Sequence, residues 1–349
     1  MRRVSRPFLN VQQSGLVLII GALMILLTVF AGSHMDRAAG HSVNNFLNAY
    51  TLMQTATDAS FFAIMAVGMT LVIISGGIDL SVGSIYALSG VLTAMALRTF
   101  GGTGGGAVWL GLAMCLGIGL LCGLLNGGLV VGLGVHPFII TLGTMWVFRG
   151  IAFVASKAES ILLPAALTDT VKSTLGFTRA LYPVPLLIML AVTGLGALYL
   201  TRTVMGRRIY AVGGNRAASE YAGLGVGRIL IGVYALSGLA AGIAAFVGSS
   251  YYGSASCADA TGYELYVIAS AVVGGASLMG GKGTAVSAML GAVLIVLIRQ
   301  SIRTLHFDQN YEWIIIGCAT IIAVVLDRLN ARLAEKRLLA RVRADVAGQ

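Results

Sequence analysis

The chain has 349 residues, of which 57% are hydrophobic, 10% are charged and 47 are glycine, and its mean hydropathy is +0.90. A soluble domain carries about 25% charged residues, so this composition excludes one and predicts an all-α polytopic membrane protein. The net charge of +10 does not indicate nucleic-acid binding. The basic residues gather at the termini and in one loop, where anionic lipid or a partner protein is the expected contact.

The first apolar run covers residues 15–32 and follows three arginines among the first seven residues. This order also fits a secretory signal peptide, but 18 residues are enough to span a bilayer. Because further apolar spans follow along the chain, we favour an uncleaved first helix. The segment 1–14 is then a cytoplasmic amino-terminal segment.

Nine more apolar segments bring the predicted number of transmembrane helices to ten, within a transmembrane domain over residues 15–326. Each segment is near the length that a bilayer requires, or slightly shorter. The glycine-rich residues 279–283 separate two short ones, which form either a tight helical hairpin or one discontinuous helix. The segments are 59–75, 82–97, 107–133, 138–155, 184–200, 229–251, 265–278, 284–298 and 313–326.

The basic residues assign the two sides of the membrane. With ten spans and a cytoplasmic amino terminus, 15 of the 23 lysines and arginines fall inside and 7 fall outside, in agreement with the positive-inside rule. Both termini and the loop 202–228 are therefore predicted to be cytoplasmic, and the tail 327–349 to leave the membrane as an amphipathic helix. Arg149 lies within a span, where an arginine must find a partner or water and is a functional candidate.

The loop 202–228 is the longest basic interruption between two spans in the second half of the chain. Asn215 can cap a short helix, and Gly223 and Gly225 offer a left-handed exit from it. Two helical turns bury little surface, so we expect this helix to dock on an acidic or grooved partner. An ordinary loop made basic by topology is the alternative. The arginines of the loop are Arg202, Arg207, Arg208, Arg216 and Arg228.

Small residues predict one close helix contact. Gly119, Gly123 and Gly127 form a four-residue repeat that lets backbones approach on one helix face, and Asn126 beside them can add a polar contact. The repeat forms either a dimer interface or a contact inside the chain.

Aromatic residues near the outward ends of spans predict an interfacial belt, with a sugar-stacking surface as the alternative. They are Tyr50, Trp109, Tyr251, Tyr252, Tyr263, Tyr311 and Trp313.

No group of residues predicts catalysis, a cofactor or a metal site. The acidic residues lie at span ends and suggest neither an acid and base pair nor a proton relay, and the four cysteines lack disulfide or metal spacing. The stretch 275–284, GASLMGGKGT, departs from a P-loop, since Ala276 stands at the first glycine and Gly283 replaces the Ser or Thr after the lysine. Energy from ATP, if used, must therefore come from another chain.

Two acidic positions have both structural and functional interpretations. Asp79 precedes Leu80 and Ser81 at the start of a span, where it acts as a helix cap or as a gate. Thr261 and Glu264 have the spacing of a capping box, with contact to a partner on the outer face as the alternative.

Three stretches together resemble a known family. The stretches GMTLVIISGGIDLSVGS (68–84) and ATGYELYVIASAVVGGASLMGGKGT (260–284), with the loop 202–228, are similar to permease subunits of bacterial ABC importers for ribose and related monosaccharides, over about residues 47–326. The resemblance implies a multi-pass inner-membrane subunit, not itself an enzyme, that moves a monosaccharide from periplasm to cytoplasm. Implied partners are an ABC ATPase subunit, a periplasmic sugar-binding protein, a second permease subunit, identical or different, and membrane lipid.

The resemblance also places an ATPase-coupling helix on residues 215–225, where Arg216 stands at a family Glu and Gly223 comes one residue late. The sugar stays open, and an ion-coupled carrier or passive channel, or a purely structural subunit, are the alternative functions. The coupling residues are Asn215, Arg216, Ala217, Ala218, Glu220, Gly223 and Gly225, and the translocation or gating candidates are Asp79, Asn126, Arg149 and Glu264.

Overall fold

The computed structural model describes residues 11–36, 41–100, 104–177, 181–319, 321–322 and 325. Within them, helices dominate and the only strands form two small antiparallel pairs, β1 with β2 and β3 with β4. In the first half the elements are α1 (Val11–Phe30), β1 (Ser33–Asp36), β2 (His41–Asn44), α2 (Ala49–Ile74), α3 (Val82–Phe100), α4 (Gly105–Leu133) and α5 (Pro137–Ser156). In the second half they are β3 (Ile161–Leu162), α6 (Ala165–Val171), α7 (Val184–Arg202), α8 (Val204–Gly214), α9 (Arg216–Tyr221), α10 (Val226–Tyr252), β4 (Ser254–Ala255), α11 (Tyr263–Val273) and α12 (Ala285–Thr304), followed by helical residues 311–319.

Eight of the described helices are long and apolar enough to cross a membrane, by length and composition. They are α1, α2, α3, α4, α5, α7, α10 and α12, while α11 is apolar but shorter. The predicted all-α membrane fold is thereby confirmed, and the total of ten spans stays a prediction. The predicted tail 327–349 and the first ten residues lie outside the described residues.

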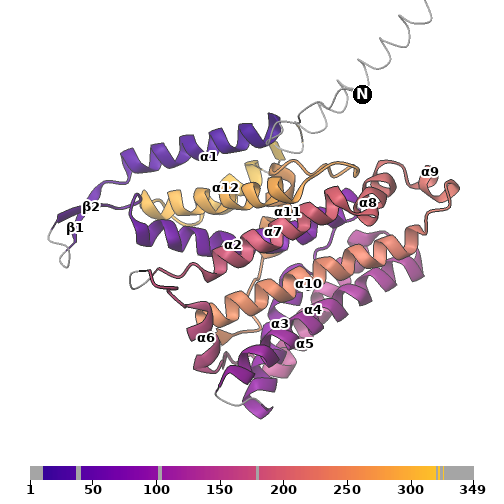
Figure 1. Ribbon diagram of the computed structural model, residues 1–349, viewed down its shortest axis with the longest axis horizontal. Coiled ribbons are helices and arrows are strands. Elements are labelled where there is room, and N and C mark those ends of the chain that lie inside the picture. Colours follow the sequence, from indigo (N-terminus) through magenta and orange to yellow (C-terminus); the bar gives the residue numbers. More distant parts are fainter. Residues whose placement is uncertain are drawn as a thin grey trace, which may run out of the picture.

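Helix α2 is the centre of the bundle, and 94% of its apolar window is buried. It packs against α7, α10, α11 and α12, and a helix that is apolar on all sides is expected at such a position. Its start at Ala49 is ten residues earlier than the predicted span, because the Asn48 side chain accepts a hydrogen bond from the amide of Thr51 and caps a polar first part. In Figure 1, α1 lies along α12 on the outside of the bundle.

The glycine repeat forms the contact between α4 and α10. A Cβ on Gly119 would overlap the carbonyl oxygen of Gly238, and one on Gly123 would overlap that of Tyr234. On the other side of the contact, a Cβ on Gly242 would overlap the carbonyl oxygen of Cys115. The two backbones therefore touch over several turns, and the repeat is an internal contact of the chain.

Helices α11 and α12 form a hairpin. Gly291 of α12 packs against the Ser270 carbonyl of α11, and Gly274 packs against Ser287, which is the pairing of antiparallel helices. The residues 274–284 between them, which we call the glycine loop, are therefore a turn and not a break within one helix.

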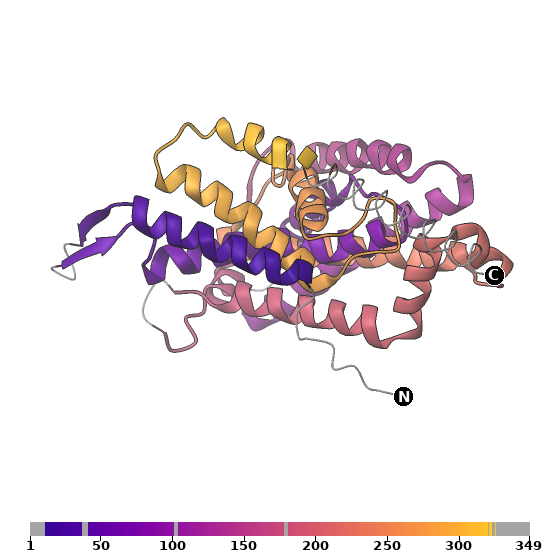
Figure 2. The same ribbon diagram turned by 90° about the horizontal axis from the view of Figure 1, so that it is seen from above.

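The two ends of the bundle differ in character. Figure 1 shows the β1–β2 hairpin and α6 at one end and the α8–α9 segment at the other. Figure 2, turned by 90°, keeps the hairpin and the α8–α9 segment at opposite ends. We call them the hairpin end and the coupling end.

Candidate functional site

Helix α9 at the coupling end is stabilised by its own local hydrogen bonds. The Asn215 side chain accepts a hydrogen bond from the Ala218 amide at 2.9 Å, as the sequence predicted. Arg216 and Glu220, one turn apart, form an ion pair of 3.1 Å. This pair is exposed, so its contribution to stability is small. The cap fixes where the helix begins, and the ion pair supports its outer face.

Helix α9 ends in a turn that needs glycine. Gly223 has a φ of +77°, its amide donates to Glu220, and the next amide, that of Leu224, donates to Ser219. This pairing is the Schellman arrangement, in which a left-handed residue satisfies the last carbonyls of a helix. The predicted left-handed exit at Gly223 is therefore confirmed. The same prediction for Gly225 is wrong, because its φ is −71° and it caps the start of α10.

Sequence reasoning missed α8, which fills the first part of the loop 202–228. The Thr203 hydroxyl accepts a hydrogen bond from the Gly206 amide and caps this helix. That signal was present in the sequence, since Thr is a favoured cap residue directly before Val204. Asn215 therefore ends α8 and begins α9, so the segment is a pair of helices with a sharp corner.

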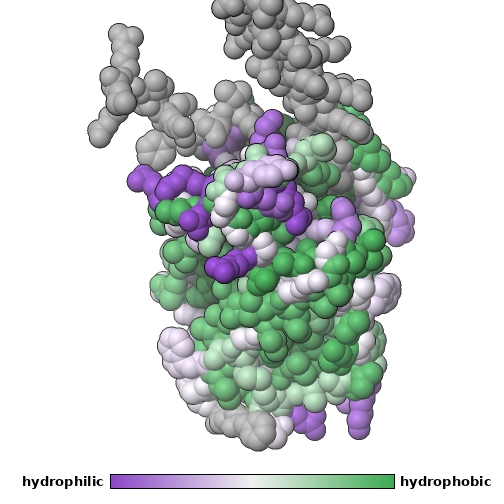
Figure 3. Space-filling view, turned by 90° about the vertical axis from the view of Figure 1, so that its right-hand side faces the viewer, coloured by the Kyte–Doolittle hydropathy of each residue, from purple (hydrophilic) through white to green (hydrophobic). Residues whose placement is uncertain are grey.

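The α8–α9 segment presents a basic surface with small apolar residues. All five arginines of the loop are exposed, as are Ala217 and Ala218, and Tyr221 is 92% exposed. Ser219 is the buried residue of α9. Figure 3 views the molecule from this end, and hydrophilic residues gather in its upper part above a broad hydrophobic surface.

The α8–α9 segment packs against α7 and α10, and it meets α2 and the glycine loop at a crowded point that we call the glycine junction. The Gly281 amide of the glycine loop donates to the Ile74 carbonyl at the end of α2, at 2.8 Å. A Cβ on Gly213 of α8 would overlap that same carbonyl. The Tyr210 hydroxyl of α8 donates to the Gly283 carbonyl at 2.7 Å. Helix α8 therefore touches both the central helix and the α11–α12 hairpin.

Arg149 of α5 binds the loop between α10 and α11. Its guanidinium donates to the carbonyl oxygens of Cys257 and Asp259, at 2.6 Å each, and to that of Ala260 at 3.4 Å. A partner for this intramembrane arginine was expected, and backbone carbonyls supply it. In the same loop, burial raises the pKa of the Asp259 carboxyl, against the lowering effects of the Ser256 amide and the Arg149 charge.

Arg149 and Glu264 line one cavity of about 270 Å³, together with Trp146 and Ser84. The structure therefore brings two of the four translocation candidates together. The predicted capping box is wrong, because α11 begins after Gly262, whose φ is +82°, and the Thr261 hydroxyl donates to the Ala258 carbonyl instead. The left-handed turn at Gly262, and not a hydroxyl cap from Thr261, starts this helix.

Asp79 and Asn126, the other two candidates, lie in a buried hydrogen-bonded cluster. The Asp79 carboxylate accepts from the amide and hydroxyl of Ser81 and, through its second oxygen, from the Ser237 hydroxyl of α10 at 3.0 Å. The Asn126 side-chain amide donates to the Ser81 hydroxyl at 2.7 Å. Both residues are 0% exposed. The cluster ties the α2–α3 connection to α4 and α10. The bonds to Ser81 match the cap interpretation of Asp79, and Ser237 is a partner that sequence reasoning missed.

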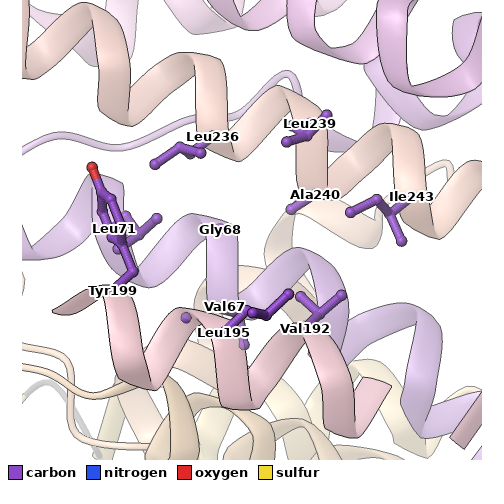
Figure 4. A pocket seen from close by; sticks show the side chains of 11 residues that line it. Val67, Gly68, Leu71, Val192, Leu195, Tyr199, Leu236, Leu239, Ala240 and Ile243 are labelled. Atoms are coloured by element: carbon purple, nitrogen blue, oxygen red, sulfur yellow. The ribbon is translucent and has the colours of Figure 1, made fainter. Parts of the chain in front are cut away.

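A groove between α2, α7 and α10 has an apolar lining. Its volume is about 340 Å³, and Figure 4 shows Leu71 of α2, Leu195 and Tyr199 of α7, and Leu236 and Ile243 of α10 around it. A hydrophilic solute would find almost no hydrogen-bond partner here. The groove suits an acyl chain or an apolar side chain better than a sugar.

Comparisons with known proteins agree with this architecture. The family described as branched-chain amino acid transport system / permease component matches residues 51–324. The D-allose transport system permease protein AlsC of Escherichia coli K12 is 37% identical over 294 residues, covering 82% of this chain and 86% of that protein. The ribose import permease protein RbsC of Haemophilus influenzae is 36% identical over 307 residues, covering 88% and 91%. The probable ABC transporter permease protein y4mJ of Sinorhizobium fredii is 34% identical over 313 residues, covering 90% and 89%.

No solved structure gives a significant match. The family match confirms the resemblance that the motifs indicated and lies close to its expected extent of 47–326. The similar proteins are transport permeases. They support the interpretation of this chain as a transport subunit without enzymatic activity, and not the alternative of a secondary carrier or passive channel. The chain belongs to this family of transport-system permease components, and it is a multi-pass inner-membrane subunit of an ABC importer.

Proposed function

We propose that this subunit imports a monosaccharide. We further propose that α9 docks on a separate ATPase subunit, and that closure of the ATPase moves the helix bundle. The relatives that transport allose and ribose support the substrate class. The proposal includes a second permease subunit, identical or different, a sugar-binding protein at the hairpin end, and lipid around the exposed apolar helices.

The glycine junction is the observation that carries the coupling part of the proposal. Helix α9 exposes nearly all its residues and buries little, so it gains most of its packing only when a partner covers it. A force applied to α9 passes through Asn215 to α8, and from α8 to α2 and to the glycine loop. The contacts of Gly213 and Gly281 with the Ile74 carbonyl are between backbones, and the Tyr210 hydroxyl adds a side-chain hydrogen bond to the glycine loop. Contacts packed this closely transmit displacement well.

The exposed arginines suggest the chemistry of the partner surface. Five positive charges around a small-residue face favour an acidic groove, and rim charges of this kind steer association and set register more than they add affinity. The coupling residues are then Asn215 and Gly223 as the two ends of α9, Ala217 and Ala218 as its contact face, and Arg216 with Glu220 as its edge.

Crosslinking tests the docking site. An Ala218→Cys variant in a Cys318→Ser background should crosslink to the ATPase in native membranes and should resist an impermeant thiol reagent added from outside. The remaining native cysteines of the described chain are buried, so the reporter is specific. Ready labelling from outside would refute both the cytoplasmic placement and the coupling role.

Transport measurements test the coupling itself. Gly223→Pro should reduce uptake more than about ten-fold while the protein still inserts, because proline cannot adopt a φ of +77° and removes the amide that bonds Glu220. Gly214→Ala is the matched control, since a Cβ there meets nothing within 4 Å. Normal uptake by Gly223→Pro would contradict the proposal.

A further inference from the structure

A polar cavity lies beside the first turn of α11, and the coupling contacts do not involve it. Its volume is about 220 Å³, several times the ~30 Å³ that one water occupies in the liquid. Tyr263 and Tyr266 of α11 and Arg299 of α12 form one wall, and residues after α12, among them Glu312 and Trp313, form the other. A space of this size fits a small solute.

The cavity lies within the hairpin half of the bundle, with an opening toward that end. Helix α11 has 11 residues, which span about 16 Å, or half of a ~30 Å hydrocarbon core. Its last residue leads into the glycine loop at the coupling end, so its first turn stops well inside the molecule. Tyr266 is buried at 4%, whereas Gln309 and Asn310 are exposed in the turn after α12.

The charges of the cavity are already paired. The Nε atom of Arg299 lies 2.6 Å from Oε1 of Glu312, and these side chains are 20% and 14% exposed. The same guanidinium lies over the rings of Phe62 and Tyr266, at 5.3 Å and 5.1 Å from their centroids. An ionic solute would have to separate this pair, which is costly once the charges are partly buried. The cavity therefore favours a neutral solute.

The other lining groups select among neutral solutes. Trp313 is 57% exposed, and its ring lies 5.6 Å from that of Tyr266, so a flat apolar face is open to the cavity. The amides of Gln309 and Asn310 offer donors and acceptors at its mouth. A molecule with several hydroxyl groups and one face of C–H bonds satisfies both kinds of surface.

We propose that this cavity is a solute subsite of the permease itself, for a neutral polyhydroxylated molecule of monosaccharide size, at the hairpin end of the route. The inference rests on the proposed function. It excludes a branched-chain amino acid from the same subsite, because a zwitterion brings a separate carboxylate and ammonium group to a pocket whose own charges are paired.

Protection from labelling tests the subsite. In a Cys318→Ser background, Asn310→Cys is treated with an impermeant maleimide on the assembled importer, with D-ribose or D-allose present or absent. Sugar at twice its dissociation constant should slow labelling about three-fold, since only one third of the subsites stay empty. Gln309→Cys serves as a second reporter. Phe307→Cys is the control, because Phe307 is 59% exposed in the same turn and does not line the cavity.

A further variant distinguishes sugar binding in the cavity from a change in the accessibility of the reporter cysteine. Trp313→Leu should abolish protection at Asn310→Cys and leave the rate of labelling without sugar unchanged. If neither sugar protects either reporter in an importer that takes up ribose or allose, the subsite is refuted and the proposed function stands. Protection by leucine instead of sugar would refute the solute class. An importer that takes up neither sugar would refute the proposed function and the subsite with it.

Discussion

The contact between α4 and α10 and the exposed helix α9 are stabilised in opposite ways. In the first, glycines bring two backbones together with no room for a side chain, and Gly119, Gly123 and Gly127 are all buried. In the second, a cap and one exposed ion pair support six residues, and Tyr221 is 92% exposed. The first is specified by packing within the chain. The cap stabilises helix α9 by only about 1 kcal/mol and the exposed ion pair by less, so this helix depends on a partner for further stability.

The largest effect is expected in the packed contact. Gly123→Val should destabilise the protein by about 3 kcal/mol or more, because its Cβ would overlap the carbonyl oxygen of Tyr234 and two helix backbones cannot separate without losing their other contacts. Thermal unfolding in detergent and the yield of inserted protein measure this loss.

Gly128→Val is the control for that experiment. Gly128 is one residue beyond the repeat on the same helix, and a Cβ there meets nothing within 4 Å. We expect wild-type stability from it. Equal stability of both variants would show that the α4–α10 contact is loose and that the contrast with α9 is false.

A smaller effect is expected at Arg149, which combines features of both regions as a polar anchor inside an apolar bundle. Arg149→Leu removes the donors to three part-buried backbone carbonyls beside a cavity. Water in that cavity can replace part of these hydrogen bonds, so the total loss should be about 1–3 kcal/mol. We expect uptake to fall about ten-fold while insertion persists, because the loop 257–260 loses its anchor.

Arg149→Lys sharpens this measurement. Lysine keeps the positive charge but cannot make the same fork of hydrogen bonds to Cys257 and Asp259, so its uptake should lie between those of the wild type and Arg149→Leu. Undiminished uptake by Arg149→Leu at normal expression would show that the arginine is dispensable for transport.

The smallest effect is expected at the cap of α9. Asn215→Ala removes the acceptor for the Ala218 amide and should cost about 1 kcal/mol, or about five-fold in the affinity for the ATPase if helix formation is coupled to docking. Titration of the detergent-solubilised permease with the ATPase measures it. Asn215→Ser keeps an uncharged cap acceptor and should bind like the wild type. Equal weakening in both variants would contradict the cap as the cause.

Local chemistry made the α9 segment predictable. A cap requires one side chain and one amide three residues apart, so Asn215 and Gly223 carried the information within nine residues of sequence. The same reasoning failed at Thr261 and Glu264, where the spacing of a capping box was present but Gly262 adopts a left-handed turn and starts α11 after it. It also failed at Gly225, because the following helix takes this glycine as its own cap.

The sequence by itself determined the membrane class, the all-α fold and most of the helices. Burial in lipid requires long apolar segments whose backbone groups are hydrogen-bonded within the segment, and both requirements depend on the local sequence alone. Only the tertiary structure decided that the glycine repeat faces α10, that Arg149 binds the loop 257–260, and that Arg299 pairs with Glu312. These partners are from 13 residues apart (Arg299 and Glu312) to 123 residues apart (Gly119 and Gly242) along the chain. The type of a residue determines which kind of contact it needs, and the packing of the helices determines which distant residue makes that contact.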